Sequence, residues 1–390
     1  MKLRNDYSDI RGVCHYPDAS KSKEQVEREL GYAERLQINS IRFWLRQEEW
    51  EADADGYFDL VLDFIRRCNA HGISVMPIFW NGNSIASFTT PTEAEWQKME
   101  KYAAAVMNAL KGEPNILMWD VMNEPYCNDY IRKCPDPALL PERMDNLQQL
   151  VRRMCGIIRG LDPDGVLTVG HELISHCEST VDLIDVISFH DYLKTRAEIE
   201  AVYTAAEQLS QKTGKPLLNT ETGCIGRSNP YDLELEICSS HKVGWYLFQL
   251  MVEGSWGDIH GIVYPDGTIR DPAIVAAMFG FYRKRSPGRM RANPNKEGYV
   301  YGAIEAVEQA LRVEETALFQ SKRKTTDDIL EAAERCVNIL ESNELVPMWN
   351  PPSAQIADWR AQPEAERDLL AIKKFAYDMA KLLRESCLIL

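Results

Sequence analysis

Two glutamates, Glu124 and Glu221, each follow a short run of apolar residues, and their type and position indicate chemistry. Glu124 lies in an Asn-Glu-Pro tripeptide after the run 115–121, and Glu221 ends the run 215–220. Such runs are typical of strands in a parallel sheet, because helices cover both faces of that sheet. A carboxylate at the end of a buried strand is partly desolvated, which costs free energy unless function uses it. Two of them on separate strands therefore suggest acid/base and nucleophile chemistry on a sugar acetal.

The elements that must position these glutamates alternate along most of the chain. Longer segments such as 23–36 and 92–110 repeat apolar residues with helical spacing, and shorter apolar runs between them predict strands. Eight such units favour a closed (β/α)8 barrel over an open doubly wound sheet. No G-x-G-x-x-G motif follows the first predicted strand, which counts further against a nucleotide-binding sheet. The predicted strands are residues 10–15, 40–44, 74–79, 116–122, 166–170, 186–190, 217–221 and 243–251.

The last part of the chain has a different character. Proline, glycine and basic residues cluster between residues 286 and 295, as in a connector. Beyond this cluster, apolar residues recur in three stripes with helical spacing. Three helices in about 100 residues bury little core by themselves. We therefore predict a catalytic barrel over residues 1–289 and a helical extension over residues 290–390 that packs on the barrel.

The ends of the predicted strands are rich in polar and aromatic side chains. In barrels of this kind, functional groups lie at the carboxyl ends of the strands and in the loops that follow. His15 is a candidate ligand for a hydroxyl group and Trp80 a candidate sugar-binding indole. For a single residue a structural interpretation stays open, since a strand-end glutamate can simply pair with Arg42. The side chains at these ends include His15, Arg42, Trp80, Asn123, Glu124, His190, Tyr192, Glu221 and Trp245.

Several of these features occur in the order of the predicted strands. They are Arg42 on the second strand, Asn-Glu-Pro after the fourth, Ser-Phe-His-Asp-Tyr at 188–192, Glu221 after the seventh and Trp245 on the eighth. In this order they resemble the motifs of clan A retaining glycoside hydrolases, and the greatest similarity is to the cellulase-like glycoside hydrolase family 5. The resemblance covers roughly residues 10–285.

The resemblance implies a reaction and a substrate class. Glu124 would be the general acid/base and Glu221 the nucleophile of a double displacement through a covalent glycosyl-enzyme. Asn123 would bond the 2-hydroxyl group of the sugar. The expected substrates are β-linked oligo- or polysaccharides of the glucan or mannan type.

The resemblance also implies roles for the surrounding side chains. Arg42 and Tyr192 would hold Glu221 ionised and oriented, which agrees with the effect of a nearby arginine on the pKa of a carboxyl group. His190 would line the reacting subsite. Trp245 would form its floor, because an indole face suits the apolar C–H face of a pyranose ring.

Two other classes of function stay open. A barrel that binds carbohydrate without cleaving it has the same fold, although the presence of both glutamates counts against it. A metal-dependent or Schiff-base enzyme is the other class, and His171, Glu172 and His190 are its candidate ligands. No lysine and no H-x-E motif lies at a predicted strand end, so we expect neither a metal nor another cofactor.

Composition limits the partners and the compartment. The net charge of −15 argues against nucleic acid or an anionic membrane and fits a neutral carbohydrate. No run approaches the roughly 20 apolar residues that span a bilayer.

The ten cysteines show neither C-x-x-C pairs nor regular spacing, which fits a reducing compartment. The first residues lack the apolar core of a signal peptide, so we expect a cytoplasmic protein. The oligomeric state is not indicated.

Overall fold

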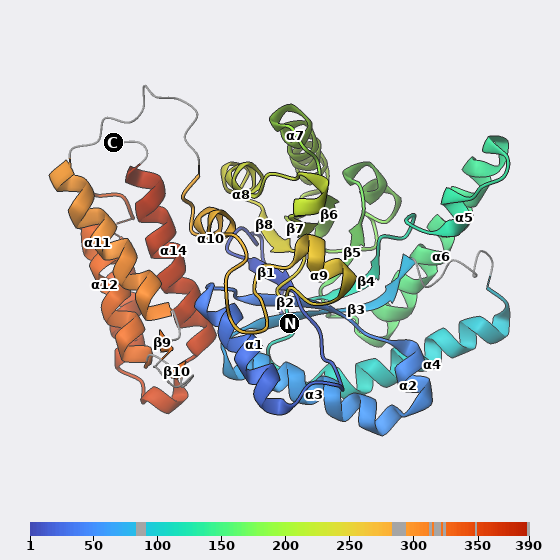
Figure 1. Cartoon of the computed structure of the whole chain (residues 1–390), viewed down its shortest axis with the longest axis horizontal. Helices are drawn as coiled ribbons and strands as arrows, with labels where there is room; N and C mark the ends of the chain where they lie inside the picture. The colour runs from blue at the N-terminus through green and yellow to red at the C-terminus, as the bar shows by residue number, and fades with distance from the viewer. Residues whose placement is uncertain are drawn as a thin grey trace. The chain divides into compact units, whose positions relative to one another are not determined.

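Eight parallel strands form a closed barrel, in which each strand pairs with its neighbours in sequence and β1 also pairs with β8 (Figure 1). The structure, a computed structural model, describes residues 1–82, 91–282, 294–311, 314–315, 321–322, 325–347 and 349–387. The predicted (β/α)8 fold is confirmed. The strands are β1 (Arg11–Cys14), β2 (Ser40–Trp44), β3 (Ser74–Asn81), β4 (Trp119–Asn123), β5 (Leu167–His171), β6 (Ile187–Asp191), β7 (Leu217–Thr222) and β8 (Gly244–Leu247).

Helices connect the strands, and local sequence marks where they begin. Thr92 and Thr195 each cap the helix that follows: the threonine hydroxyl accepts an N–H of the first turn, and a glutamate there accepts the threonine N–H. Gly214 ends α7 in the left-handed conformation with φ +71°. The helices are α1 (Lys23–Arg35), α2 (Gln47–Ala52), α3 (Ala54–Ala70), α4 (Glu93–Leu110), α5 (Asp129–Arg132), α6 (Leu140–Leu161), α7 (Arg196–Thr213), α8 (Tyr231–Ser240), α9 (Gly254–His260) and α10 (Pro272–Met278).

The strands are buried along almost their whole length, because helices cover the outside and side chains fill the inside. Most predicted strand ends differ from the observed ones by one or two residues, and the largest differences lie in two strands. The run 116–122 contributes a strand only from Trp119, and Ile116 forms an isolated bridge. The run 243–251 contains β8 only up to Leu247. Beyond it, Phe248 and Leu250 each donate one backbone N–H to the last residue of β7 and of β1, and Met251 forms an isolated bridge with Val263.

The chain forms two compact units. The first unit comprises Met1–Glu29 and Ser40–Tyr282, and the second comprises Leu30–Asn39 and Arg283–Leu390. The predicted boundary at residue 289 lies outside the described residues, and the packing of the extension on the barrel stays a prediction. None of the described helices combines the length and the apolar composition that crossing a lipid bilayer requires.

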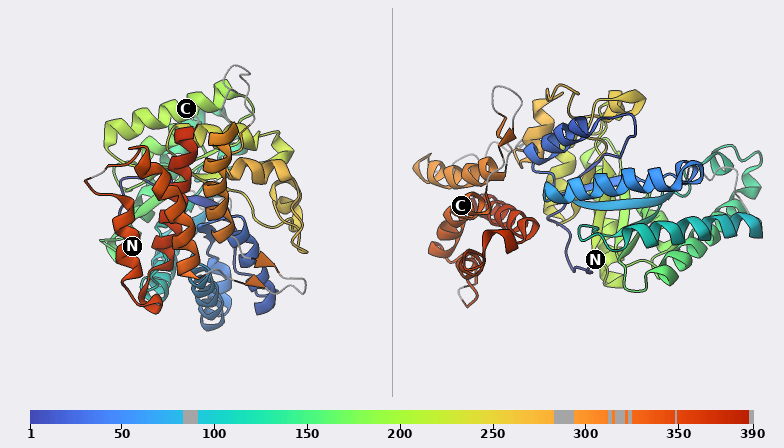
Figure 2. Two further views of the ribbon diagram at one scale, coloured as in Figure 1. Left: turned by 90° about the vertical axis from the view of Figure 1, so that its left-hand side faces the viewer. Right: turned by 90° about the horizontal axis from the view of Figure 1, so that it is seen from below.

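Helices dominate the second unit and share one apolar core. The stripes predicted from the sequence supply that core, together with Ile356 of a short helix that was not predicted. Figure 2 shows the longer helices of this unit side by side. Its elements are α11 (Pro294–Leu311), β9 (Glu314–Glu315), β10 (Ser321–Lys322), α12 (Thr326–Ser342), α13 (Pro352–Arg360) and α14 (Leu369–Cys387).

Candidate active site

Glu124 directly follows β4 and has a left-handed backbone with φ +45°. Its N–H donates to the carbonyl of Gly170 on β5 at 2.8 Å, and its carbonyl accepts the N–H of Cys127 at 3.1 Å. Gly82 leaves room for this turn, since a Cβ at position 82 would lie 2.0 Å from the Glu124 carbonyl oxygen. A non-glycine residue in such a conformation costs about 1–3 kcal/mol and persists where its surroundings hold it, which is common at functional sites.

Glu221 points into the barrel because β7 contains one extra residue. Successive residues of β6 pair with Asn219 and Glu221, which leaves Thr220 without a counterpart. The pairing with β8 is irregular at the same place. In a regular strand, residues 219 and 221 would share one face. The bulge instead directs Asn219 to Tyr203 of α7 and Glu221 to the centre of the barrel.

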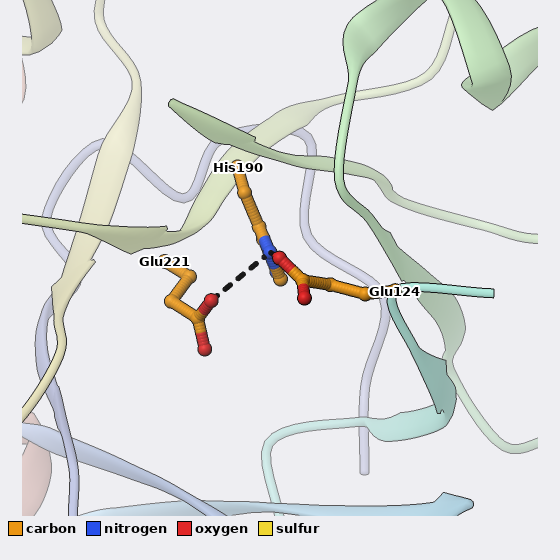
Figure 3. Close-up of side chains that lie close together, drawn as sticks. All are labelled: Glu124, His190 and Glu221. Carbon is orange, nitrogen blue, oxygen red and sulfur yellow. Dashed lines mark hydrogen bonds and ion pairs between the residues drawn. The ribbon is translucent and has the colours of Figure 1, made fainter. Parts of the chain in front are cut away.

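The two glutamates meet at the mouth of the barrel, with His190 of β6 between them (Figure 3). One carboxylate oxygen of Glu124 and one of Glu221 lie within 4.8 Å of each other. His190 Nδ1 lies 2.9 Å from Glu124 Oε1 and 3.2 Å from Glu221 Oε2, so it must carry a proton to bond either carboxylate. The separation fits the roughly 5–5.5 Å of retaining glycosidases and not the roughly 6.5–9.5 Å that leaves room for a water molecule.

Arg42 of β2 is fully buried and links Glu221 to other polar groups of the barrel. Its Nη1 lies 3.4 Å from Glu221 Oε1, and its Nη2 donates to Asn123 Oδ1 at 2.7 Å. Nε and Nη2 also donate to Asp120 Oδ2, at 3.0 and 2.8 Å. Asp120 was not among the predicted site residues. Its signal in the sequence is an acidic residue inside an apolar run, which requires a buried partner.

Charges at the site are set by these contacts. Burial alone would raise the pKa of the Glu221 carboxyl, but His190 and Arg42 hold it well below its usual range. Burial alone would lower the pKa of the His190 imidazole, but Glu221 and Glu124 raise it to about 9. At neutral pH Glu221 is therefore ionised and His190 is protonated. Burial raises the pKa of Tyr192, which keeps its hydroxyl neutral.

Gly170 on β5 leaves the space that the Arg42–Asp120 pair occupies. A Cβ at position 170 would lie 2.5 Å from Arg42 Nη2 and 2.9 Å from Asp120 Oδ2. We expect Gly170→Ala to lower the free energy of unfolding in urea by about 1–3 kcal/mol, because the buried pair must shift. Gly156→Ala on α6 is the matched control, since a Cβ there meets no atom within 4 Å. Equal unfolding curves for the two variants would contradict this prediction.

A cavity of about 710 Å³ contains both glutamates. Of the predicted binding residues, Trp80, Asn123 and Tyr192 line it, whereas Arg42 and His190 lie buried beneath it. The guanidinium of Arg227 lies over the Tyr192 ring, 4.5 Å from its centre. Other ring-bearing residues in the wall are Tyr16, Trp44, Phe79, Phe248, Trp256 and His260.

Trp245 lies away from this cavity. It pairs with Arg11, the first residue of β1, and its ring lies 5.9 Å from the Arg11 guanidinium. The prediction that Trp245 forms the floor of the reacting subsite is therefore wrong. The physical reason is that Trp245 is the second residue of β8 and lies near its amino end, whereas Phe248 directly follows the last residue of the strand and lines the cavity.

His15 was predicted to bind a sugar hydroxyl group, and this prediction is also wrong. It is buried, lies outside the cavity lining, and places Nε2 at 3.1 Å from Glu29 Oε2 of α1. Lys21 donates to the same carboxylate at 2.7 Å and to Glu253 at 2.5 Å. His15 therefore belongs to a buried ion-pair cluster that joins the loops after β1 and β8.

One group in the described part of the chain has its potential ligand atoms close enough for a metal ion: Glu124, His190 and Glu221. His190 Nδ1 bonds both carboxylates, and their charges raise the pKa of its imidazole to about 9, so a metal ion would have to displace this proton. The ligands considered from the sequence do not converge, since His171 bonds a threonine hydroxyl and Glu172 bonds another histidine. The site suits proton transfer and attack by a carboxylate better than metal chemistry.

Sequence comparison identifies the family. The model of the cellulase family, glycosyl hydrolase family 5, matches residues 19–257, which is more than half of the chain. The chain belongs to this family, and it is a retaining glycoside hydrolase. No curated protein sequence matches it.

Solved structures with the same barrel include glycoside hydrolases. The endo-1,4-β-mannanase of Rhizomucor miehei has 14% identity and a TM-score of 0.53, covering 69% of this chain and 92% of its own. The hyperthermostable endo-1,4-β-D-mannanase of Thermotoga petrophila RKU-1 has 15% identity and a TM-score of 0.54, covering 69% and 99%. The cellulose synthase subunit Z of Clostridioides difficile has 14% identity and a TM-score of 0.52, and the match covers 69% of this chain and 99% of its own. At these identities the similarity shows the fold alone.

Proposed function

We propose that this enzyme cleaves β-linked oligo- or polysaccharides of the glucan or mannan type, with Glu221 as nucleophile and Glu124 as general acid/base. The observation that carries the proposal is the approach of the two carboxylates to within 4.8 Å at the mouth of the barrel. A covalent intermediate needs this short separation, because the nucleophile must reach the anomeric carbon directly.

In the first step the ionised carboxylate of Glu221 attacks the anomeric carbon. The bond from that carbon to the leaving oxygen breaks, and the proton of Glu124 passes to the oxygen. The product is a glycosyl ester of Glu221 and an ionised Glu124. In the second step Glu124 takes a proton from water, whose oxygen attacks the same carbon and releases the Glu221 carboxylate.

His190 serves both steps. The negative charge moves from Glu221 to Glu124 in the first step and returns in the second. His190 Nδ1–H lies 2.9 Å and 3.2 Å from the two carboxylates, so it can bond whichever of them is ionised. Arg42 stays paired with the nucleophile, and Asn123, which Arg42 holds, faces the cavity for the 2-hydroxyl of the sugar.

Two observations support the substrate class. Two of the similar structures are endo-1,4-β-mannanases, which supports β-linked mannan-type chains as substrates. The wall of the cavity includes the indoles of Trp44, Trp80 and Trp256, and indole faces suit the C–H faces of pyranose rings.

A panel of aryl β-glycosides and β-linked gluco- and manno-oligosaccharides tests the proposal. For a cleaved substrate, proton NMR in the first minutes should show the β-anomer of the new reducing end before mutarotation. Initial formation of the α-anomer would overturn the assignment of Glu221 as nucleophile. Absence of cleavage across the panel would overturn the substrate class.

Variants of Phe248 and Trp245 distinguish a residue that binds the sugar from a residue that packs in the protein interior. We expect Phe248→Ala to lower kcat/KM by about 2- to 12-fold, since the contact of an aromatic ring is worth about 0.5–1.5 kcal/mol. Trp245→Ala should leave kcat/KM near that of the wild type but lower the free energy of unfolding by about 3–5 kcal/mol, the cost of truncating a buried tryptophan. Kinetics with an aryl β-glycoside and thermal unfolding measure both. A folded Trp245→Ala variant with the larger loss of kcat/KM would restore the original prediction.

A further inference from the structure

A buried polar network lies behind the strand that carries Glu221. Its members come from three elements: Asn219 from β7, Tyr203 from α7 and Glu234 from α8. All three side chains are 0% exposed, so none of them touches substrate. Buried polar groups are costly unless their hydrogen bonds are satisfied, so a network of this size needs a reason.

The first arm of the network ends on the backbone of the nucleophile. The N–H of Glu221 donates to Asn219 Oδ1 at 3.1 Å, and Asn219 Nδ2 donates to the Tyr203 hydroxyl oxygen at 2.8 Å. The Tyr203 hydroxyl lies 2.9 Å from Glu234 Oε1. Glu234 is thus connected to the Glu221 backbone through two side chains.

The second arm ends on the residues after the nucleophile. Asn229 Nδ2 donates to Glu234 Oε2 at 3.3 Å, and Asn229 Oδ1 accepts the Gly223 N–H at 3.0 Å. The Thr222 hydroxyl lies 3.3 Å from the same oxygen. Both oxygens of Glu234 therefore hold the segment 219–223, one from each side of Glu221.

The bulge at Thr220 explains why this segment needs support from outside the sheet. It directs Asn219 outward and Glu221 inward, and it interrupts the regular pairing of β7 with both neighbours. A strand segment with an interrupted ladder loses part of the backbone hydrogen bonding that fixes its position. Asn219 supplies a replacement acceptor for the N–H of Glu221.

Glu234 has no cationic partner among the described residues, which sets it apart from Glu221. Burial, and then the nearby Asp191, raise the pKa of Glu234 well above its usual range. A neutral carboxyl group both donates and accepts hydrogen bonds, and the amide of glutamine can do the same from the same positions. Burial thus favours the neutral form of Glu234, which adds no negative charge next to the nucleophile.

We propose that Glu234, acting through Tyr203 and Asn219, is a positioning residue that holds Glu221 against Arg42 and His190. This inference rests on the proposed role of Glu221 as nucleophile. A small displacement of Glu221 would lengthen its contacts with Arg42 Nη1 at 3.4 Å and His190 Nδ1 at 3.2 Å. It would slow attack on the anomeric carbon without removing any group that binds the sugar.

Tyr203→Phe tests the first arm, because it removes one hydroxyl group and keeps the ring. We expect kcat to fall about 10- to 100-fold with KM nearly unchanged, the effect of a misplaced reacting group. The acid limb of kcat/KM should move up by about one pH unit, since weaker contact with its cations raises the pKa of Glu221. The titratable and charged groups that face Glu221 are Cys14, Arg42, Glu124, His190, Tyr192 and His260.

Tyr246→Phe is the matched control. Its hydroxyl lies 2.6 Å from Ser40 Oγ at the first residue of β2, and the residue is equally buried. The Tyr246→Phe variant should lose about as much thermal stability as Tyr203→Phe, while its kcat and the acid limb of its kcat/KM profile stay unchanged. For Glu234 itself, Glu234→Gln should keep kcat near that of the wild type, whereas Glu234→Leu should lower it as Tyr203→Phe does.

The outcomes separate this inference from the proposed function. If Tyr203→Phe has the kcat of the wild type and the same acid limb in its kcat/KM profile, the positioning role of Glu234 is overturned. A Glu234→Gln variant as slow as Glu234→Leu would overturn it as well. Because Tyr203→Phe decides the question, a Glu234→Leu protein that does not fold leaves the test intact. An active Glu221→Ala variant would instead overturn the proposed function, and the positioning role with it.

Discussion

Glu221→Ala is expected to abolish turnover, with kcat falling by a factor on the order of 10⁶, the scale seen when an enzyme loses its nucleophile. Without the carboxylate no glycosyl ester can form, and Arg42 and His190 lose the anion that they hold. Kinetics with an aryl β-glycoside and mass spectrometry of the wild type with a slow, activated glycoside measure the effect. The wild type should gain the mass of one sugar, and the variant should not.

Glu172→Ala is the matched control for this loss. Glu172 also follows a barrel strand, directly after β5, but it bonds His176 at 2.6 Å and lies outside the cavity lining. It should therefore keep nearly full activity. The low pKa of Glu221 adds a second expectation: the nucleophile stays ionised as the pH falls, so the acid limb of wild-type kcat/KM should lie below pH 4.5. Turnover by Glu221→Ala would contradict the assignment.

Glu124→Ala should show a loss that depends on the leaving group. For natural β-linked oligosaccharides we expect kcat/KM to fall by about 10²–10⁴, because the leaving oxygen must depart without a proton. Dinitrophenyl glycosides, whose leaving group needs no protonation, should form the glycosyl-enzyme at a nearly normal rate. The intermediate then accumulates, since no base activates water. Stopped-flow release of dinitrophenol should show a burst followed by slow turnover.

Azide provides the control for this variant. It needs no general base, so it should accelerate turnover of Glu124→Ala and give a glycosyl azide of β configuration. The basic limb of the pH–rate profile should also flatten, because that limb reports loss of the proton of the acid. An α-glycosyl azide, or an equal loss for all leaving groups, would show that Glu124 is not the acid/base.

Much of the fold and the reacting pair could be predicted from the sequence. Apolar runs that alternate with amphipathic segments specify parallel βα units locally, because burial on both faces of a sheet dictates composition. A glutamate at the end of such a run then falls at the carboxyl end of a barrel strand, where Glu124 and Glu221 lie. The family resemblance added Asn123 and Tyr192, which line the cavity, and His190, which bridges the two glutamates.

The tertiary structure decided which way side chains face and which partners they meet. Trp245 lies near the amino end of β8, and Phe248, directly after the strand, lines the cavity instead. His15 lies at a strand end as predicted, but Glu29 of α1 binds it away from the cavity. Asp120 acquires its role only through Arg42, which comes from another strand.

The bulge in β7 shows most directly why the sequence alone does not predict which way a side chain faces. The alternation of side chains along a strand is local, but its phase depends on pairing with the neighbouring strands, and one extra residue reverses it. Thr220 is that residue, and it alone allows Asn219 to face the helices while Glu221 faces Glu124. The sequence by itself therefore determined the barrel and the identity of its two carboxylates. Only the packing of strands and helices determined the bulge, the contacts of Arg42 and His190, and hence the geometry in which those carboxylates act.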